Sequence, residues 1–169
     1  MKKKLDKNHI LYKQKLYPYK KNRNLLKHQN SILLGIGGNI GDVRRRFNHL
    51  FISLQKSPYI TTVETSPILK NPPFGYLNQN DFHNSLIYAK TSLQPKALLR
   101  YILRLEKKFK RKRSFQDAPR TLDIDIIFYN NITINTHELT IPHPAWRERS
   151  SVTIPMSYMK SLYIKKVNI

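Results

Sequence analysis

The sequence predicts a single folded domain that mixes β-strands with α-helices. The chain has 169 residues, of which 40% are hydrophobic, and this is enough for one core. Short segments rich in β-branched and aromatic residues recur along it, and two longer segments have the apolar spacing of amphipathic helices. No apolar run reaches membrane-spanning length, and the Lys-rich start lacks the apolar segment of a secretory signal.

The composition is strongly basic and contains no cysteine. The formal net charge is +21, which favours polyanionic partners such as nucleic acid, nucleotides or acidic membrane surfaces without choosing among them. The absence of cysteine excludes disulfides and thiolate metal sites, and it fits a reducing cytoplasm.

Residues 1–30 form a distinct basic segment. They contain nine Lys and one Arg against Asp6 as the one acidic residue, and their apolar residues show little periodicity. The sequence therefore predicts a mobile extension here, with at most a marginal helix, and a single domain over residues 31–169. We expect the extension to be dispensable for catalysis.

The domain is expected to begin with a short buried strand at Ile32–Ile36. The segment Gly-Gly-Asn-Ile-Gly-Asp at 37–42 then allows a tight turn into a helix over Val43–Gln55. The Gly-Lys-Ser/Thr ending of a phosphate-binding loop is missing, so a plain strand-to-helix turn is favoured. The alternative is that these small residues let the backbone approach a ligand closely.

Two further strands are expected at Ile60–Ile68 and Phe82–Ala89, joined by a loop that contains Pro72 and Pro73. The paired prolines hold Phe74 where it can cover a flat ligand, or they simply make a rigid turn. Phe82 and Asn84 share one face of their strand, where a ring and an amide can stack on and hydrogen-bond a heterocycle; a strand-end Asn is the plainer alternative.

A second amphipathic helix is expected from about Pro95 to Lys112, with the basic run Lys107–Arg113 at its end. Such a run is commonly a solvated face or a nucleic-acid patch. Here it lies close in sequence to two aspartates, which suits a complex of polyphosphate and metal.

The two aspartates lie in the stretch Pro119–Tyr129, whose composition predicts a strand. With a period of two, Asp123 and Asp125 share a face, where they repel each other unless a cation lies beside them. Hard cations such as Mg²⁺ prefer carboxylate oxygens, and Arg120 adds a group that binds phosphate. An amphipathic edge strand with its polar face in water is the alternative.

The last third of the chain holds a proline-bounded loop, residues 139–149, with His143, Trp146 and two arginines. Such loops usually bind something, although a Trp is often only a lid on the core. Ile132–Ile134 is expected to pair as a hairpin, and Val152–Tyr158 to form a terminal strand or short helix.

Several of these motifs, in this order, are together similar to one family. They are Gly-Gly-Asn, Asn-Pro-Pro-Phe-Gly, Phe-His-Asn, Glu106 with Arg111 and Arg113, Ala-Pro-Arg-Thr-Leu-Asp-Ile-Asp-Ile, and Ile-Pro-His-Pro-Ala-Trp-Arg-Glu-Arg. Over about residues 31–159 the chain resembles 6-hydroxymethyl-7,8-dihydropterin pyrophosphokinase of folate biosynthesis.

The resemblance implies an α+β fold with a ferredoxin-like βαββαβ core, an antiparallel sheet and helices packed on it. It implies transfer of the β,γ-pyrophosphoryl group of ATP to a pterin hydroxymethyl oxygen, with release of AMP. It implies two Mg²⁺ ions held by Asp123 and Asp125. We expect a cytoplasmic monomer with no membrane or specific nucleic-acid partner.

The resemblance also assigns roles to individual side chains. Contacts to the ATP phosphates, or ordering of the loops, are implied for Arg111, Arg113, Arg120, His143 and Arg149. Glu106 and Thr140 are expected at the nucleotide site. Pterin contacts are implied for Asn71, Phe74, Phe82 and Asn84.

The chain departs from the family pattern at two places. Ser151 stands where an aromatic usually closes the pterin site, so Phe74 or Trp146 replaces that ring or the pterin is held more loosely. Asp117-Ala118 replaces a Trp-Gly pair, which puts one loop contact in doubt.

Two other classes of function are compatible with parts of the sequence. A nucleic-acid-binding module fits the charge, but the central strand carries aspartates rather than an RNA-binding aromatic consensus. A two-metal nuclease would use the same carboxylates. The stiffened loop and the Phe82/Asn84 pair favour a small heterocycle over a polymer.

Overall fold

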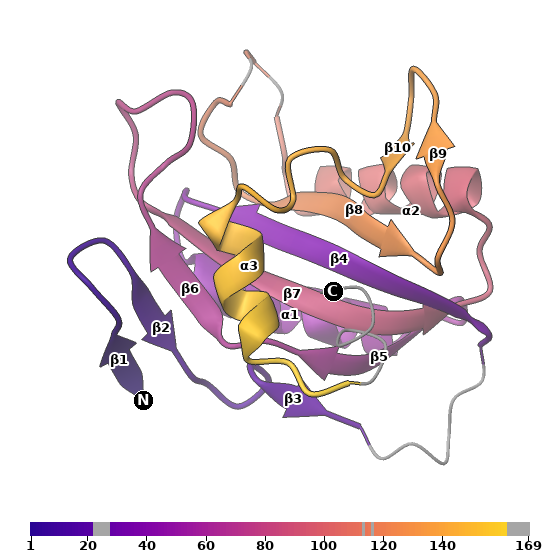
Figure 1. The fold of residues 1–169 in the computed structure, drawn as a ribbon, viewed down its shortest axis with the longest axis horizontal. Helices are drawn as coiled ribbons and strands as arrows, with labels where there is room; N and C mark the ends of the chain where they lie inside the picture. Colours follow the sequence, from indigo (N-terminus) through magenta and orange to yellow (C-terminus); the bar gives the residue numbers. More distant parts are fainter. Residues whose placement is uncertain (22–27, 113, 116, 162–169) are drawn as a thin grey trace.

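The structure is a computed structural model that describes residues 1–21, 28–112, 114–115 and 117–161. It has an α+β architecture in which an antiparallel sheet is flanked by three helices (Figure 1). The expected mixture of strands and helices is therefore confirmed. None of the described helices is long and apolar enough to span a membrane.

The main sheet is built from eight strands. The path of neighbouring strands is β1 (Lys2–Lys4), β2 (Ile10–Tyr12), β6 (Ile68–Asn71), β7 (Phe82–Thr91), β4 (Asn30–Gly38) and β8 (Asp123–Tyr129). Beside this path, β5 (Ile60–Thr65) pairs with β7, and β3 (Tyr19–Lys20) pairs with β5. A separate hairpin joins β9 (Ile134–Asn135) to β10 (Thr140–Ile141).

Two helices contribute to the larger core. Helix α1 (Val43–Gln55) begins where the Asp42 carboxylate accepts a hydrogen bond from the backbone N–H of Arg45 (3.0 Å), as an N-cap does. Helix α2 (Pro95–Lys108) begins with proline in its first turn. Both helices bury side chains three or four residues apart, which pack against Ile32, Leu34 and Ile36 of β4.

Helix α3 (Ser150–Ser157) belongs to a second core cluster. Its buried Val152 and Met156 pack with Leu33, Leu86 and Trp146. Because side chains alternate across a strand, Leu33 faces away from the cluster that contains Ile32 and Leu34. Helix α3 therefore covers the sheet face opposite α1 and α2.

Several element boundaries differ from those expected. The expected strand at 60–68 is two strands, β5 and β6, separated by Ser66 and Pro67. Gly37 and Gly38 belong to β4 rather than to the turn, which is made instead around Gly41 with φ of +67°. Helix α2 ends at Lys108 instead of near Lys112.

The described part of the basic segment differs from the mobile extension that we expected. Strand β2 adds to the edge of β6, and β1 adds to β2, so their backbone groups are paired. Leu11 and Tyr17 are buried, and the Tyr17 hydroxyl donates to the Phe47 carbonyl of α1 (3.1 Å). The segment gains order from pairing with a distant edge, for which no local periodicity is required.

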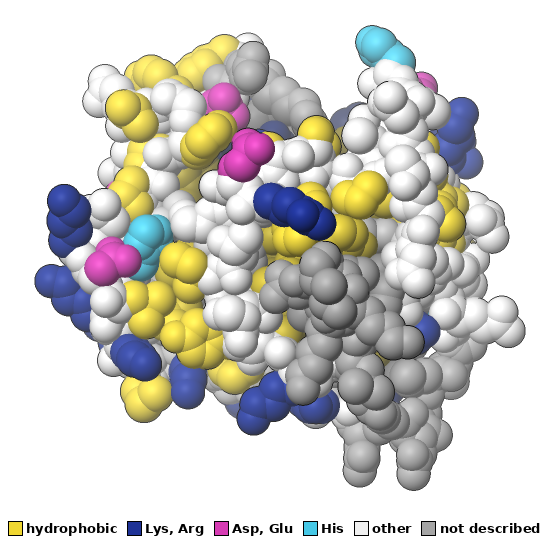
Figure 2. Space-filling model, in the orientation of Figure 1, with side chains coloured by type: hydrophobic (Ala, Val, Ile, Leu, Met, Phe, Trp, Pro, Cys, Tyr) yellow, Lys and Arg dark blue, Asp and Glu magenta, His cyan; other side chains and the backbone are white. Residues whose placement is uncertain are grey.

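Most of the described lysines of this segment are exposed. Lys2, Lys3 and Lys4 of β1 are all exposed. Figure 2 shows basic side chains gathered along the edge formed by β1, β2 and β3. Charge on an edge strand opposes pairing with another chain, because like-charged edges repel.

Candidate active site

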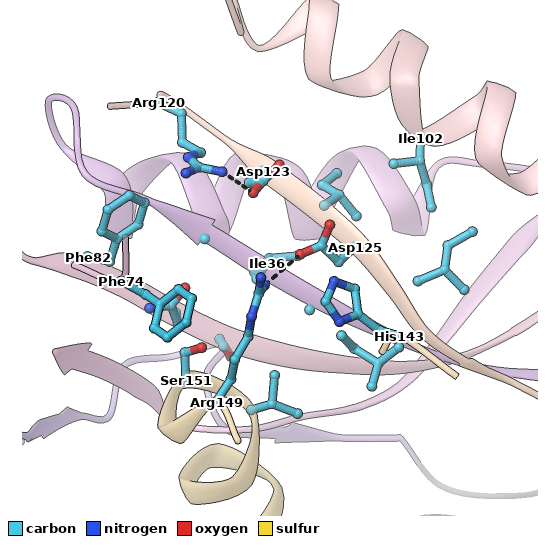
Figure 3. A pocket seen from close by; sticks show the side chains of 18 of the residues that line it. Ile36, Phe74, Phe82, Ile102, Arg120, Asp123, Asp125, His143, Arg149 and Ser151 are labelled. Atoms are coloured by element: carbon cyan, nitrogen blue, oxygen red, sulfur yellow. Dashed lines mark hydrogen bonds and ion pairs between the residues drawn. The ribbon is translucent and has the colours of Figure 1, made fainter. Parts of the chain in front are cut away.

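A cleft of about 450 Å³ brings together most of the residues expected at the site. It is lined by side chains from β4, β7 and β8, from the start of α3, and from the loops around Phe74 and His143 (Figure 3). The expected residues that line it are Asn71, Phe74, Phe82, Asn84, Arg111, Arg120, Asp123, Asp125, Thr140, His143 and Arg149.

The register of three strands forms the floor of this cleft. Gly37 of β4 pairs with Asn84 of β7 on one side and with Asp123 of β8 on the other. Two residues earlier on β4, Gly35 pairs with Asp125 of β8. Directly opposed residues share a face, so an amide and two carboxylates project from the same side of the sheet over positions without side chains.

Glycine is needed at the centre of this row. A Cβ on Gly37 would lie 2.6 Å from the Asn84 side-chain oxygen. The pattern Gly35-Ile36-Gly37, with glycine at alternate positions on one face of a strand, is a signal of this arrangement that the sequence itself contains. It marks a place where a ligand can approach the sheet closely.

Asp123 is neutralised by two arginines. Its two carboxylate oxygens lie 2.7 Å from Nη1 of Arg111 and 2.7 Å from Nη1 of Arg120. Arg111 also donates to the Leu122 carbonyl (3.2 Å), and Arg120 donates through Nε to the Ala118 carbonyl (3.0 Å). Both guanidinium groups are therefore fixed at the cleft, where they can bind phosphate oxygens.

Asp125 lies in a less neutralised position. Among the described residues its nearest ion-pair partner is Arg149, whose Nη1 is 3.7 Å from Asp125 Oδ2 (Figure 3). Burial and the nearby charge of Asp123 raise the pKa of Asp125 to about 6, and Arg149 opposes this shift. In the absence of a ligand, Asp125 thus lacks part of the positive charge that it needs to ionise readily.

The carboxylate pair fits a hard divalent cation. Two oxygen donors project from one face, and one of them is charge-deficient, which a cation would correct. The described residues contain no cluster of three or more His, Cys, Asp or Glu that would complete a cation site. This suits Mg²⁺, which usually keeps waters and takes further oxygens from substrate phosphates.

The opposite end of the cleft combines amides with aromatic rings. Asn84 donates through Nδ2 to Oδ1 of Asn71 (2.7 Å), and Asn71 donates to the Pro72 carbonyl (2.8 Å). The Arg120 guanidinium lies 5.3 Å from the centre of the Phe82 ring. Phe74 is largely exposed, and Arg149 lies 5.7 Å from the centre of its ring.

The Gly-Gly-Asn motif connects the loops around the cleft. Asn39 accepts a hydrogen bond from the Arg120 backbone N–H (2.9 Å) and donates to Gln79 Oε1 (2.8 Å) and the Asn80 carbonyl (3.0 Å). Gln79 donates in turn to the Asp117 carbonyl (2.9 Å). We had not predicted roles for Asn39 and Gln79, because the segments that they join are far apart in sequence.

Two polar atoms in the cleft wall are poised for a ligand. His143 Nδ1 and Arg149 Nε are buried and have no hydrogen-bond partner among the described residues. A third such atom on a residue that lines the cleft, Arg111 Nε, lies 3.8 Å from a Glu106 carboxylate oxygen, so it has an ion-pair partner. Burial, and then the charge of Arg149, lowers the pKa of His143, which favours the neutral form of its ring. Buried polar atoms normally have partners, so these two indicate a place for a polar group.

The remaining expected residues have different positions. Glu106 is buried and accepts a hydrogen bond from the Ile124 backbone N–H (2.9 Å), so it supports β8 from below and does not line the cleft. Arg113 lies outside the described residues. Trp146 packs against Phe128 in the second core cluster and does not line the cleft, whereas Ser151 does.

Comparison with known proteins is consistent with this geometry. Residues 33–161 match the model of the family described as 7,8-dihydro-6-hydroxymethylpterin-pyrophosphokinase. A 2-amino-4-hydroxy-6-hydroxymethyldihydropteridine pyrophosphokinase of Helicobacter pylori is 39% identical over 142 residues, which cover 83% of this chain and 87% of that protein. The protein of the same name from Campylobacter jejuni is 35% identical over 144 residues, 85% of this chain and 91% of its own.

A less similar relative still matches about three quarters of the chain. The protein of that name from Bacillus subtilis is 34% identical over 128 residues, which cover 76% of this chain and 77% of that protein. The family match spans the strands, loops and helix that form the cleft. This chain belongs to the 7,8-dihydro-6-hydroxymethylpterin-pyrophosphokinase family.

Proposed function

We propose that the cleft on β8 is where this chain carries out the reaction of its family. The chain is an ATP-dependent pyrophosphokinase that transfers a pyrophosphoryl group from ATP to hydroxymethyldihydropterin in folate synthesis. In the proposed step, the pterin hydroxymethyl oxygen attacks the β-phosphorus, the bond from that phosphorus to the α,β-bridging oxygen breaks, and AMP leaves. The hydroxyl proton passes to solvent or to a phosphate oxygen.

One observation carries the placement of both substrates. Asn84, Gly37 and Asp123 form a row across three neighbouring strands. The amide and the carboxylate are therefore about two strand spacings apart, about 10 Å. A heterocycle held at the Asn84 end would direct its hydroxymethyl group toward a polyphosphate held at the Asp123 end, and such alignment is a large part of phosphoryl-transfer catalysis.

Asp123 and Asp125 would hold the metal, for which we propose two Mg²⁺ ions. When bound, the ions would neutralise charge on the transferring phosphates. The arginines act beside them: Arg111 and Arg120 are ordered by backbone carbonyls at the cleft and point at Asp123. They would bind and orient the same phosphates and stabilise charge as AMP leaves.

The nucleotide would also contact the loop side of the cleft. Thr140, His143 and Arg149 line it there. The unpartnered His143 Nδ1 and Arg149 Nε would take up polar atoms of the ATP. Glu106 would act indirectly, because it holds Ile124 between the two aspartates.

The pterin would lie between the rings at the other end of the cleft. Phe82 and Phe74 would cover its flat faces, and the linked amides of Asn84 and Asn71 would bind its polar edge. Since Trp146 packs in the core, Phe74 is the ring available to compensate for Ser151.

Two broader properties belong to the same proposal. The succession β4-α1-β5-β7-α2-β8, with β4 between β7 and β8, supports a ferredoxin-like core to which β6 and the first three strands are added. Because one copy supplies both ends of the cleft, we propose a monomer, and the absence of cysteine favours the cytoplasm.

Product analysis tests the proposal. The purified chain should release AMP, and not ADP, from ATP only when Mg²⁺ and 6-hydroxymethyl-7,8-dihydropterin are both present. An RNA-binding titration in the same buffer serves as the control for the charge of the chain. Release of ADP, or tight RNA binding that ATP displaces without any AMP release, would overturn the assignment.

A further inference from the structure

The first strands of the chain reach the helix that carries two cleft residues. His9 Nε2 lies 3.3 Å from Ser150 Oγ, although the residues are 141 positions apart. Ser150 is the first residue of α3 and stands between Arg149 and Ser151, which both line the cleft. In Figure 1 the β1–β2 hairpin extends the sheet beyond β6, beside the part of the sheet that α3 crosses.

The His9 ring is held in place by Asp6. The Asp6 Oδ1 atom accepts the backbone N–H groups of Asn8 (2.7 Å) and His9 (2.9 Å), and the carboxylate lies 2.9 and 3.0 Å from His9 Nδ1. An ionised carboxylate can only accept, so Nδ1 carries the proton, and in the neutral ring Nε2 accepts from the Ser150 hydroxyl.

The direction of the His9 side chain follows from the sheet. His9 alternates with Leu11, which is buried and pairs with Leu69 of β6, the partner of Asn84. These residues share the face covered by α3. Addition of β2 to the sheet edge thus directs His9 toward the helix, and its side chain is 19% exposed.

Helix α3 depends on such contacts at its start. It has eight residues, it contains Pro155, and the side chain of its N-cap residue, Arg149, makes no capping hydrogen bond. A helix this short has little stability of its own, and tertiary contacts therefore set its position. A shift of its first turn would move the Arg149 guanidinium away from Asp125 and away from the part of the cleft that Arg149 lines.

We infer that Asp6 and His9 are positioning residues for the pyrophosphokinase cleft, acting through Ser150 on Arg149 and Ser151. The inference rests on the proposed role of Arg149 in binding ATP. Asp6, His9 and Ser150 are linked in the order found in serine hydrolases, but none of them lines the cleft. Their function is therefore to orient residues that contact the substrate.

Steady-state kinetics of the full-length chain test this role. His9→Ala and Ser150→Ala should each raise the KM for MgATP about three- to tenfold, with kcat changed less than about twofold, since the loss of one hydrogen bond misplaces a binding group. The double variant should resemble the single ones, because both changes remove the same contact. His9→Gln, whose amide can still meet the hydroxyl, should restore most of the affinity.

Controls separate positioning from general stability and from the proposed function. His49→Ala, on the exposed side of α1 across the sheet, should leave the KM and the melting temperature unchanged. Arg149→Ala should raise the KM for MgATP at least as much as His9→Ala. If Arg149→Ala has no effect, the proposed role of Arg149 fails, whatever His9 does.

The KM values and melting temperatures of the variants can also contradict the positioning role of His9 separately from the role of Arg149. It is overturned if Arg149→Ala raises the KM while His9→Ala and Ser150→Ala stay within about twofold of wild type. It is also overturned if His9→Gln is as impaired as His9→Ala, or if the melting temperatures fall in parallel with the affinity, since a purely structural contact would behave in that way.

Discussion

Asp123 and Asp125 are two residues apart on one strand but have different electrostatic surroundings. Asp123 contacts two arginines at 2.7 Å, whereas the nearest ion-pair partner of Asp125 within the described part of the chain, Arg149, is 3.7 Å away. The sequence predicted their shared face from the period of two. It could not predict this asymmetry, because the arginines reach Asp123 through the ends of α2 and of the loop before β8.

The free energy of unfolding of the metal-free protein should depend on pH through Asp125. A carboxyl group whose pKa is raised in the fold, here to about 6 from a usual 3.8, binds its proton more tightly when folded. Asp125 should therefore lower the free energy of unfolding as the pH rises from about 4 through about 6. Asp125→Asn removes that loss.

Asp125→Asn should thus stabilise the metal-free protein at pH 7, by about 1 kcal/mol after allowance for solvent screening, because the side chain is 37% exposed. Asp123→Asn should instead destabilise it, since two ion pairs are weakened. Urea unfolding at several pH values without Mg²⁺ measures both changes. Parallel pH profiles for wild type and Asp125→Asn would contradict the first prediction.

Ser151 is the second residue with a testable consequence. It lies at the cleft beside Arg149 and near Phe74 (Figure 3), at the place where the resemblance led us to expect an aromatic ring. Ser151→Phe should lower the Kd for the pterin several-fold, since one stacking contact contributes roughly 1 kcal/mol. Ser157→Phe, at the exposed end of the same helix, is the control. Unchanged affinity in Ser151→Phe would mean that Phe74 already fills the place.

Among the elements, α3 shows how contacts with distant segments position a cleft residue. Its start meets His9, and the segment after it is held by Glu64 of β5. The buried Glu64 carboxylate accepts the backbone N–H groups of Lys160 (2.6 Å) and Ser161 (2.9 Å) and the hydroxyl of Ser161. Three donors offset the cost of burying this charge.

Glu64→Gln should therefore destabilise the chain by about 1–3 kcal/mol, because the amide places N–H groups against N–H donors in a buried site. Thermal unfolding measures the loss. Glu148→Gln, at an exposed position, should have little effect. A melting temperature for Glu64→Gln equal to that of wild type would show that the C-terminal contact adds nothing to stability.

The elements differ in how well the sequence predicted them, for physical reasons. Helix α1 has the predicted bounds because a capping aspartate and a regular apolar stripe are local signals. For helix α3 the sequence predicts either a strand or a short helix, because Pro155 and an irregular apolar pattern give no clear period. The cleft residues on β7 and β8 followed from period-two alternation, whereas Asn39, Gln79 and His9 act through contacts between distant segments.

At the scale of the whole molecule, the extension changes from a predicted appendage into part of the sheet. Removal of residues 1–20 would expose the β6 edge and take Tyr17 out of its contact with Phe47. We expect the truncated chain to melt at a lower temperature and to bind MgATP more weakly, because His9 is lost with it. A truncated chain with unchanged melting temperature and KM would restore the original expectation of a dispensable extension.

The net charge of +21 is likewise a property of the whole molecule. The exposed lysines of β1 lie on an edge of the sheet, whereas the ordered arginines of the cleft are paired with carboxylates or backbone carbonyls. Composition alone predicted a polyanionic partner without choosing among the candidates, whereas the geometry of the cleft supports the proposal that ATP binds there.

The most direct measurement is the turnover of Asp123→Asn and Asp125→Asn, measured as AMP release beside calorimetric binding of MgATP and of the pterin. Each variant should lose turnover by orders of magnitude and bind MgATP more weakly, because under the proposal the change removes a metal ligand where charge develops. Pterin binding without nucleotide should change little, since the proposal places the pterin at Phe82 and Asn84 and not at the two aspartates. Near-normal turnover in both folded variants would contradict the assignment of the two aspartates to the metal.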